Sequence, residues 1–228
     1  PFKVTFFFEG EEESGSPNLV PFMEKYKKEI CSDIVLICDT WLFESRVPSI
    51  VTMLRGILKE EIIITGPDKD LHSGMYGGIS TNPARVLTNV LSALHDRNGA
   101  VTIPDFYDGV LELSQNIKDQ WNSLNFKHDQ FLSDVGLSTP AGEKGRSPLE
   151  MIWSRPTCEI NGINSGYINK GFKTVLPSQA SAKISFRLVG NQDPLKIRKS
   201  FRKMVQNLVP IDCKVTFLEH EASKASQM

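Results

Sequence analysis

Residues 180–189 read Ala180-Ser181-Ala182-Lys183-Ile184-Ser185-Phe186-Arg187-Leu188-Val189, and along them apolar and polar side chains alternate. This period of two is typical of a β-strand that has one face covered and the other in water. Antiparallel sheets commonly have one such solvated face, whereas parallel strands are usually buried on both faces. The stretch therefore predicts an antiparallel sheet with helices on one side.

The segments on either side of this strand fit the same architecture. Asp193-Pro194 is a helix start, because aspartate caps the first turn and proline suits its first position. The helix that follows has an apolar stripe of Ile197, Phe201, Val205 and Leu208. Further strands are expected at 61–65 and 213–218, and a second helix at 82–95 with Pro83 in its first turn. This order predicts an α+β domain with an antiparallel sheet and two helices, of the ferredoxin-like kind.

The first part of the chain has a different pattern. Val4–Phe8 and Ile34–Cys38 are short apolar runs suited to strands buried on both faces, and Pro17–Ile30 between them has helical spacing. A strand, a helix and a strand form a βαβ unit, which implies parallel strands. We therefore expect an α/β domain here, with acidic residues just after the carboxyl ends of both strands, where such sheets place their chemistry.

These patterns divide the chain into an α/β part at 1–55, an α+β part at 56–220 and a return to the first part at 221–228. A largely helical insertion is expected at about 96–156, with helices over 108–124 and 147–153. The chain begins at Pro1 rather than methionine, and the first predicted strand follows almost at once. We accordingly expect a fragment of a longer protein.

Composition narrows the classes of function. Of the 228 residues, 40% are hydrophobic and 23% charged, and the net charge is −1. This balance gives no electrostatic reason to expect binding to nucleic acid or to a membrane surface. The basic side chains at 196–203 are expected to form the solvated face of their helix. Four scattered cysteines, with no CxxC pair, favour a reduced, cytoplasmic protein.

Acidic residues provide the first candidate site. At a turn between a strand and a helix, Glu12 and Glu13 point in different directions, so one can ligate a metal while the other faces a metal-bound water. The alternative is an acidic helix start that the helix dipole favours. Asp39 ends an apolar strand and is either a second ligand or the cap of a turn, since an unpaired buried carboxylate is unfavourable.

Two further residues have side chains suited to binding a reacting group. His72 lies among the glycines of residues 72–78, where an exposed imidazole can donate to a developing oxyanion; the alternative is a polar loop. Arg187, on the polar face of its strand, suits bidentate recognition of a carboxylate; the alternative is a surface ion pair.

Several of these segments closely resemble the M20 family of metallopeptidases, and within it the carnosine-dipeptidase-like branch. The matching segments follow family order and are residues 9–16, 37–39, 72–78, 171–177 and 186–194. The resemblance implies a two-metal enzyme that hydrolyses an amide bond in a dipeptide or an N-acyl amino acid. The metals would be two divalent ions, zinc or alternatively manganese or cobalt. The 56–220 part would be the lid, or dimerisation, domain of a homodimer.

The resemblance also implies a role for each matching residue. Glu12 would be the general base, and Glu13 and Asp39 would each ligate one metal. His72 would reach the active site of the partner subunit and stabilise the oxyanion, while Thr174 and Arg187 would contact substrate, Arg187 at its terminal carboxylate.

The chain also departs from the family pattern. The family's upstream HxD motif, its bridging aspartate and its late histidine ligand are not in this sequence. We therefore expect the segment to hold two metals poorly and to be inactive by itself. Two alternatives stay open: a desuccinylase or deacetylase acting on N-acyl amino acids, and a non-catalytic dimerisation or binding module.

Overall fold

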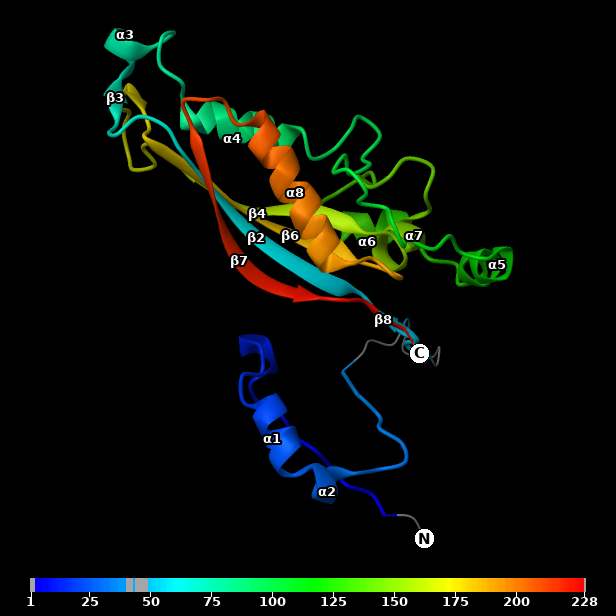
Figure 1. Cartoon of the computed structure of the whole chain (residues 1–228). Helices are drawn as coiled ribbons and strands as arrows, with labels where there is room; N and C mark the ends of the chain where they lie inside the picture. Colours follow the sequence, from blue (N-terminus) through cyan, green and yellow to red (C-terminus); the bar gives the residue numbers. More distant parts are fainter. Residues whose placement is uncertain (1–2, 40–42, 44–48, 228) are drawn as a thin grey trace. The chain divides into compact units, whose positions relative to one another are not determined.

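The structure is a computed structural model that describes residues 3–39, 43 and 49–227 (Figure 1). The chain divides into two compact units, Pro1–Val51 and Thr52–Met228, and each is described by itself. None of the helices within the described ranges is long and apolar enough to cross a membrane.

The described part of the first unit contains one 3-10 helix and two short α-helices. The 3-10 helix η1 (Glu12–Ser14) occupies the acidic turn, and α1 (Leu19–Lys25) and α2 (Lys27–Ile30) follow. The sequence predicts one helix over 17–30, but the two helices are separated at Tyr26, whose φ of −105° and ψ of 15° lie outside the helical region. The predicted helix is therefore present but interrupted.

The strands expected in this unit are not formed. Residues 4–8 and 34–38 have no strand pairing, and their large side chains are exposed, for example Phe8 at 90% and Leu36 at 84%. A strand buried on both faces needs hydrogen-bonded neighbours and covering helices, and the described part of this unit provides neither. The expectation of a parallel sheet is thus not met among the described residues.

The second unit is built on a four-stranded antiparallel sheet. Its strands are β2 (Gly56–Thr65), β4 (Thr157–Ser165), β6 (Gln179–Leu188) and β7 (Lys214–Ser223), in the order β4-β6-β2-β7. The alternation predicted for 180–189 is confirmed: the apolar residues of β6 are buried and the polar ones more accessible. The antiparallel α+β architecture expected from the sequence is therefore observed.

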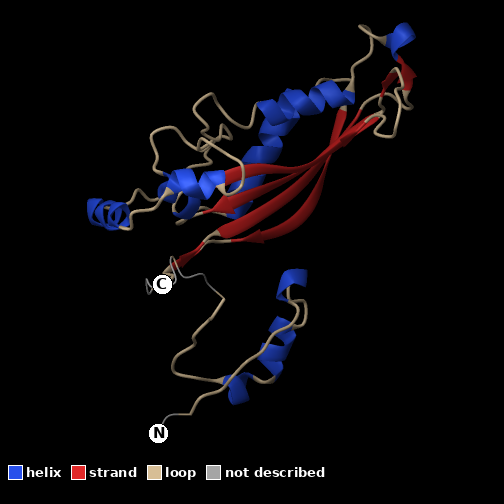
Figure 2. Ribbon diagram, turned by 180° about the vertical axis from the view of Figure 1, so that it is seen from behind, coloured by secondary structure: helices blue, strands red, loops and turns tan. Residues whose placement is uncertain are grey.

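Two helices cover the buried face of this sheet (Figure 2). They are α4 (Pro83–Ser92) and α8 (Pro194–Leu208), and each begins as predicted, with the side chains of Asn82 and Asp193 accepting bonds from backbone N–H groups of the first turn. Their buried apolar side chains pack on those of the sheet; in α8 the predicted stripe is confirmed at Ile197, Phe201 and Val205, whereas Leu208 is 43% exposed. The core includes Leu58, Ile62, Ile64, Leu87, Val90, Ile184, Phe186, Phe201 and Val205.

The insertion carries three short helices, α5 (Gln115–Ser123), α6 (His128–Ser133) and α7 (Pro148–Trp153). The helix expected over 108–124 begins only at Gln115, because Ser114 caps it there. Ser147 and Glu150 form a reciprocal capping box at α7. Arg155 binds Glu112 and Glu143, so ion pairs join separate segments of the insertion.

Two small strand pairs extend opposite ends of the sheet. At one end β1 (Met53–Leu54) pairs with β8 (Ser226–Gln227), next to the start of β2. At the other, β3 (Leu71–His72) pairs with β5 (Val175–Leu176), just before β6 begins at Gln179. The four-residue helix α3 (Ser73–Tyr76) follows β3 and forms a projecting tip (Figure 1).

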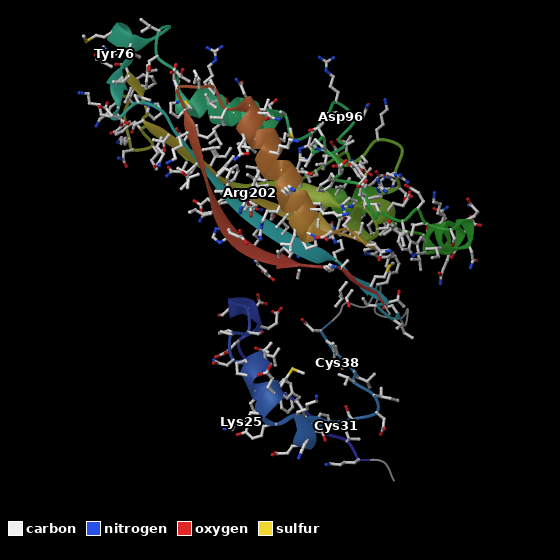
Figure 3. The ribbon with its side chains drawn as sticks, in the orientation of Figure 1. Lys25, Cys31, Cys38, Tyr76, Asp96 and Arg202 are labelled. Carbon is white, nitrogen blue, oxygen red and sulfur yellow. The ribbon has the colours of Figure 1, made fainter. Side chains whose placement is uncertain are left out.

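The basic side chains of α8 do not all form a solvated face, and this part of the prediction is wrong. Arg198 is 6% exposed and donates to the carboxylate of Glu60 at 2.7 Å, and Arg202 donates to the same carboxylate at 2.8 Å. Figure 3 labels Arg202 on the helix that crosses the sheet. Because Glu60 is buried in the centre of β2, it requires counter-charges, and α8 supplies them.

Candidate active-site residues

The hairpin-like tip brings His72 and Thr174 together. β3 and β5 pair His72 with Val175, and the backbone N–H of Ser73 donates to the carbonyl of Thr174 at 3.0 Å. A hollow of about 440 Å³ opens at this point. Its lining consists of Asp70, Leu71, His72, Phe172, Lys173, Thr174 and Val175. Two of the residues singled out by the resemblance thus share one surface, although they lie far apart in the sequence.

The ring of His72 is oriented by its own loop. Its Nδ1 atom accepts a hydrogen bond from the backbone N–H of Gly74 at 2.9 Å. A neutral imidazole that accepts at one nitrogen carries its proton on the other, so Nε2 is the donor. A β-carbon on Gly74 would stand 2.8 Å from Cε1 of His72, which is too close for any other residue without moving the ring. The glycine is therefore needed for this ring position.

Asp70 fastens the same tip to the short link between β5 and β6. Its Oδ1 atom accepts bonds from the backbone N–H of Ser178 at 2.7 Å and from the Ser178 hydroxyl at 2.9 Å. These two bonds, the backbone one first, hold the pKa of Asp70 below its usual range. Sequence reasoning missed this residue, since the bond joins segments whose proximity only the fold reveals.

Arg187 lies at the opposite end of the sheet from His72. It is exposed on the uncovered face of β6, where it pairs with Ile57 of β2 and Thr157 of β4. From Gln179, where β6 begins, to Arg187 the strand extends about 26 Å, at about 3.3 Å per residue. Arg187 and the hollow at the tip therefore cannot contact the same small molecule within one chain.

The acidic candidates lie in the first unit. Glu12 and Glu13 belong to η1 and are exposed, and so is Asp39, which follows no strand. Glu11 instead accepts bonds from the side chain of Asn18 at 2.9 and 3.0 Å, which fixes it to the start of α1. The structure thus separates Glu11, with a local structural role, from its two neighbours.

A metal centre needs more donors than converge here. Among the described residues no group of three or more His, Cys, Asp or Glu side chains is arranged to hold an ion. Glu13 and Asp39 are hard oxygen donors of the type that divalent ions accept, but structural and catalytic sites use three or four protein ligands. The residues present do not by themselves fit a two-metal centre.

A larger hollow, of about 800 Å³, lies elsewhere, between α8 and the turn that precedes α5. Its lining includes Asp105, Asp108, Asn191, Lys196, Lys199 and Lys203. None of the residues predicted for the site lines it, and its acids and lysines offer mixed charge. We therefore take the hollow at the tip, which contains His72, as the better candidate.

Comparison with known proteins agrees with this fold. Residues 52–213 match the profile of the M20 peptidase dimerisation domain. The Cys-Gly metallodipeptidase DUG1 of Candida albicans is 33% identical over 201 residues, which are 86% of this chain and 41% of that protein. The human Beta-Ala-His dipeptidase is 27% identical over 210 residues, 91% of this chain and 41% of that protein.

Solved structures give the same result. The structure of human carnosine dipeptidase 1 superposes with a TM-score of 0.82 at 24% identity, over 96% of this chain and 47% of that one, and so shares the fold. The structure of the dipeptidase Dug1p from Saccharomyces cerevisiae superposes with a TM-score of 0.80 at 28% identity. The match covers 97% of this chain and 47% of that one. The chain spans less than half the length of these relatives.

Proposed function

Since the chain belongs to the M20 peptidase dimerisation domain family, we propose that it is part of a metal-dependent hydrolase that cleaves the amide bond of a dipeptide. The observation that carries this proposal is the hollow at the tip, where His72 and Thr174 stand side by side with an oriented imidazole. The curated relatives named above are dipeptidases, which favours a dipeptide over other amides.

His72 is proposed to stabilise the negative charge that develops on the carbonyl oxygen during hydrolysis. Its Nδ1 atom is engaged by the backbone N–H of Gly74, so Nε2–H is left as the donor of the ring. A neutral, preoriented donor aimed at a developing oxyanion lowers the barrier without having to reorganise during the reaction. Thr174, in the same hollow, is proposed to contact the substrate beside it.

The acidic residues of the first unit receive separate proposed roles. Glu12 would accept the proton of the attacking water, and Glu13 and Asp39 would each supply an oxygen ligand to one of two divalent ions, zinc or alternatively manganese or cobalt. When bound, such ions acidify water and polarise the substrate carbonyl. Because these donors do not complete a centre, the remaining ligands must lie outside the described residues.

A homodimer is proposed to assemble the site. An extended dipeptide spans about 7 Å, whereas β6 separates Arg187 from the hollow containing His72 by about 26 Å. Both can act on one substrate only if they come from different subunits, with the tip of one reaching the Arg187 end of the other. Arg187 is then free to bind the terminal carboxylate.

The remaining expectations fit this proposal. Residues 1–55 would be part of the catalytic domain, residues 56–220 the lid with its insertion, and residues 221–228 the return to the catalytic domain. The strand order β4-β6-β2-β7 supports a ferredoxin-like lid. A cytoplasmic location is proposed on the four free cysteines, of which two are exposed. Hydrolysis of N-acyl amino acids and a purely structural dimerisation role are the competing functions.

The test compares this chain with the complete protein encoded by its parent gene. Zinc or manganese is titrated into each, and hydrolysis of dipeptides and N-acyl amino acids is assayed. We expect the complete protein to bind two ions and to prefer dipeptides, and this chain alone to do neither. Preference for acyl amino acids would favour the deacylase, and a complete protein without metal binding or turnover would leave only the dimerisation role.

A further inference from the structure

A second arginine lies beside Arg187. Arg55 is the single residue between β1 and β2, and its charge is close enough to that of Arg187 for the two to repel. Continuing the alternation of β2 back by one residue places Arg55 on the uncovered face with Ile57 and Lys59. Ile57 is the register partner of Arg187, so Arg55 is its diagonal neighbour on that face. Diagonal neighbours in a sheet are about 7–8 Å apart, within reach of long side chains.

The backbone around Arg55 is held on both sides. Leu54 pairs with Ser226, and Gly56 pairs with Leu188. A β-carbon on Gly56 would stand 2.5 Å from the backbone nitrogen of Ala225, so the chain packs there too closely for any side chain. The position of Arg55 relative to Arg187 is thus fixed by the sheet and does not depend on a free loop.

The two guanidinium groups lack an acidic partner among the residues that the structure describes, and both side chains are exposed. Other bases on this face are matched: Lys59 binds Glu221 at 2.9 Å, and Lys183 stands opposite Glu61. The Arg55 guanidinium is nevertheless partly covered by the chain around it, and this partial burial, followed by repulsion from Arg187, lowers the pKa of Arg55. Two like charges fixed together without a carboxylate are unfavourable unless an anion joins them.

We propose that Arg55 is a second substrate-binding residue, which holds the terminal carboxylate of the substrate together with Arg187. A carboxylate has two oxygens and about four acceptor positions, enough for donors from two guanidinium groups. This inference rests on the proposed function, in which Arg187 binds the terminal carboxylate of the substrate. It makes Arg55 a determinant of specificity for substrates with a free carboxyl end.

The test uses Arg55→Gln in the complete protein, with a dipeptide as substrate and two inhibitors: the amino acid that forms its carboxyl end, and the carboxamide of that amino acid. Loss of charge-assisted bonds should raise KM and the inhibition constant of the free amino acid about tenfold to a hundredfold. The inhibition constant of the carboxamide should stay unchanged. Arg55→Lys should give a smaller rise.

Lys59→Gln is the matched control, because Lys59 lies on the same face but is paired with Glu221. It should leave KM and the inhibition constant of the free amino acid unchanged. If Arg55→Gln raised the inhibition constants of the amino acid and of its carboxamide equally, Arg55 would have a structural role. If it raised neither inhibition constant, Arg55 would have no role in binding. Both results would overturn the inference while the proposed function stood. A wild-type protein without any hydrolysis would instead overturn the proposed function and this inference with it.

Discussion

His72 and Arg187 lie at opposite ends of one antiparallel sheet, His72 beyond the start of β6 and Arg187 near its end. The sheet is a rigid spacer, since its core residues are fully buried and packed against two helices. Any reaction that uses both residues on one small substrate must therefore draw them from two chains. This geometry leads to a test by subunit mixing.

Mixing His72→Ala with Arg187→Ala subunits of the complete protein should restore activity. In a mixed dimer one site receives His72 and Arg187 from the two intact copies, and the other site carries both lesions. Random exchange makes half of the dimers mixed, so about a quarter of wild-type activity should return. The measurement is turnover of a dipeptide before and after exchange, with exchange verified by mass.

His72→Ala mixed with Thr174→Ala provides the matched negative case. These two residues share one hollow, so they come from the same subunit and every site in a mixed dimer lacks one of them. No recovery is expected. Recovery in this pair, or none in the His72 and Arg187 pair, would contradict the shared site.

Gly74→Ala should impair catalysis through the ring of His72. The added methyl would stand 2.8 Å from Cε1, so the imidazole must turn and lose its bond from the Gly74 N–H. We expect kcat to fall about tenfold to a hundredfold, within the range for losing an oxyanion donor, with metal content and Tm little changed. In a His72→Ala background the same change should have no further effect. A further fall there would show that Gly74 acts by another route.

Local patterns predicted most of the second unit. Strand alternation over 180–189, the cap at Asp193 and the helix start with Pro83 in its first turn are read from neighbouring residues, and all three are observed as expected. The buried pair of Glu60 and Arg198 was missed, because it joins residues far apart in the sequence and looks locally like a charged strand and a basic helix.

The first unit was predicted less well, for a different reason. The runs at 4–8 and 34–38 have the composition of buried strands, but composition does not supply the neighbours that a strand needs. The candidate site was likewise predicted only in part. Sequence motifs singled out His72, Thr174 and Arg187, but only the strand register shows that His72 and Thr174 meet while Arg187 is remote.

The anchor between Asp70 and Ser178 should be visible in a pH titration of the chain. Its hydrogen bonds lower the folded-state pKa of Asp70 below that of the unfolded chain, so they stabilise the fold at pH above the ordinary carboxyl range. This contribution is lost as pH falls through the folded-state pKa. Titration of the Asp70 side-chain carbon by NMR should give a low pKa, raised in Ser178→Ala but still below the usual value, because the backbone donor remains. An Asp70 pKa that does not change in Ser178→Ala would contradict the bond.

Replacement of Arg198 by methionine should strongly destabilise the chain. The Glu60 carboxylate is buried, and Arg198 donates to it at 2.7 Å while also binding Glu219 at 2.7 Å. Removing one partner leaves a buried charge poorly compensated, which typically costs about 3–5 kcal/mol. Denaturant unfolding of Arg198→Met should show a loss of this size, partly offset because Arg202 still binds Glu60.

Two further variants separate the buried charge from the loss of packing. Glu60→Leu combined with Arg198→Met removes both charges and should recover much of the lost unfolding free energy, because well-packed apolar residues can replace a buried ion pair. Lys59→Gln breaks an exposed pair on the neighbouring position of β2 and should change that free energy by no more than about 1 kcal/mol. If Arg198→Met lowered the unfolding free energy no more than Lys59→Gln does, the bond between Arg198 and Glu60 would be a solvated one. The expectation of an exposed basic face on α8 would then stand. If the double variant were as unstable as the single, the loss would lie in the packing of the long arginine side chain rather than in its charge.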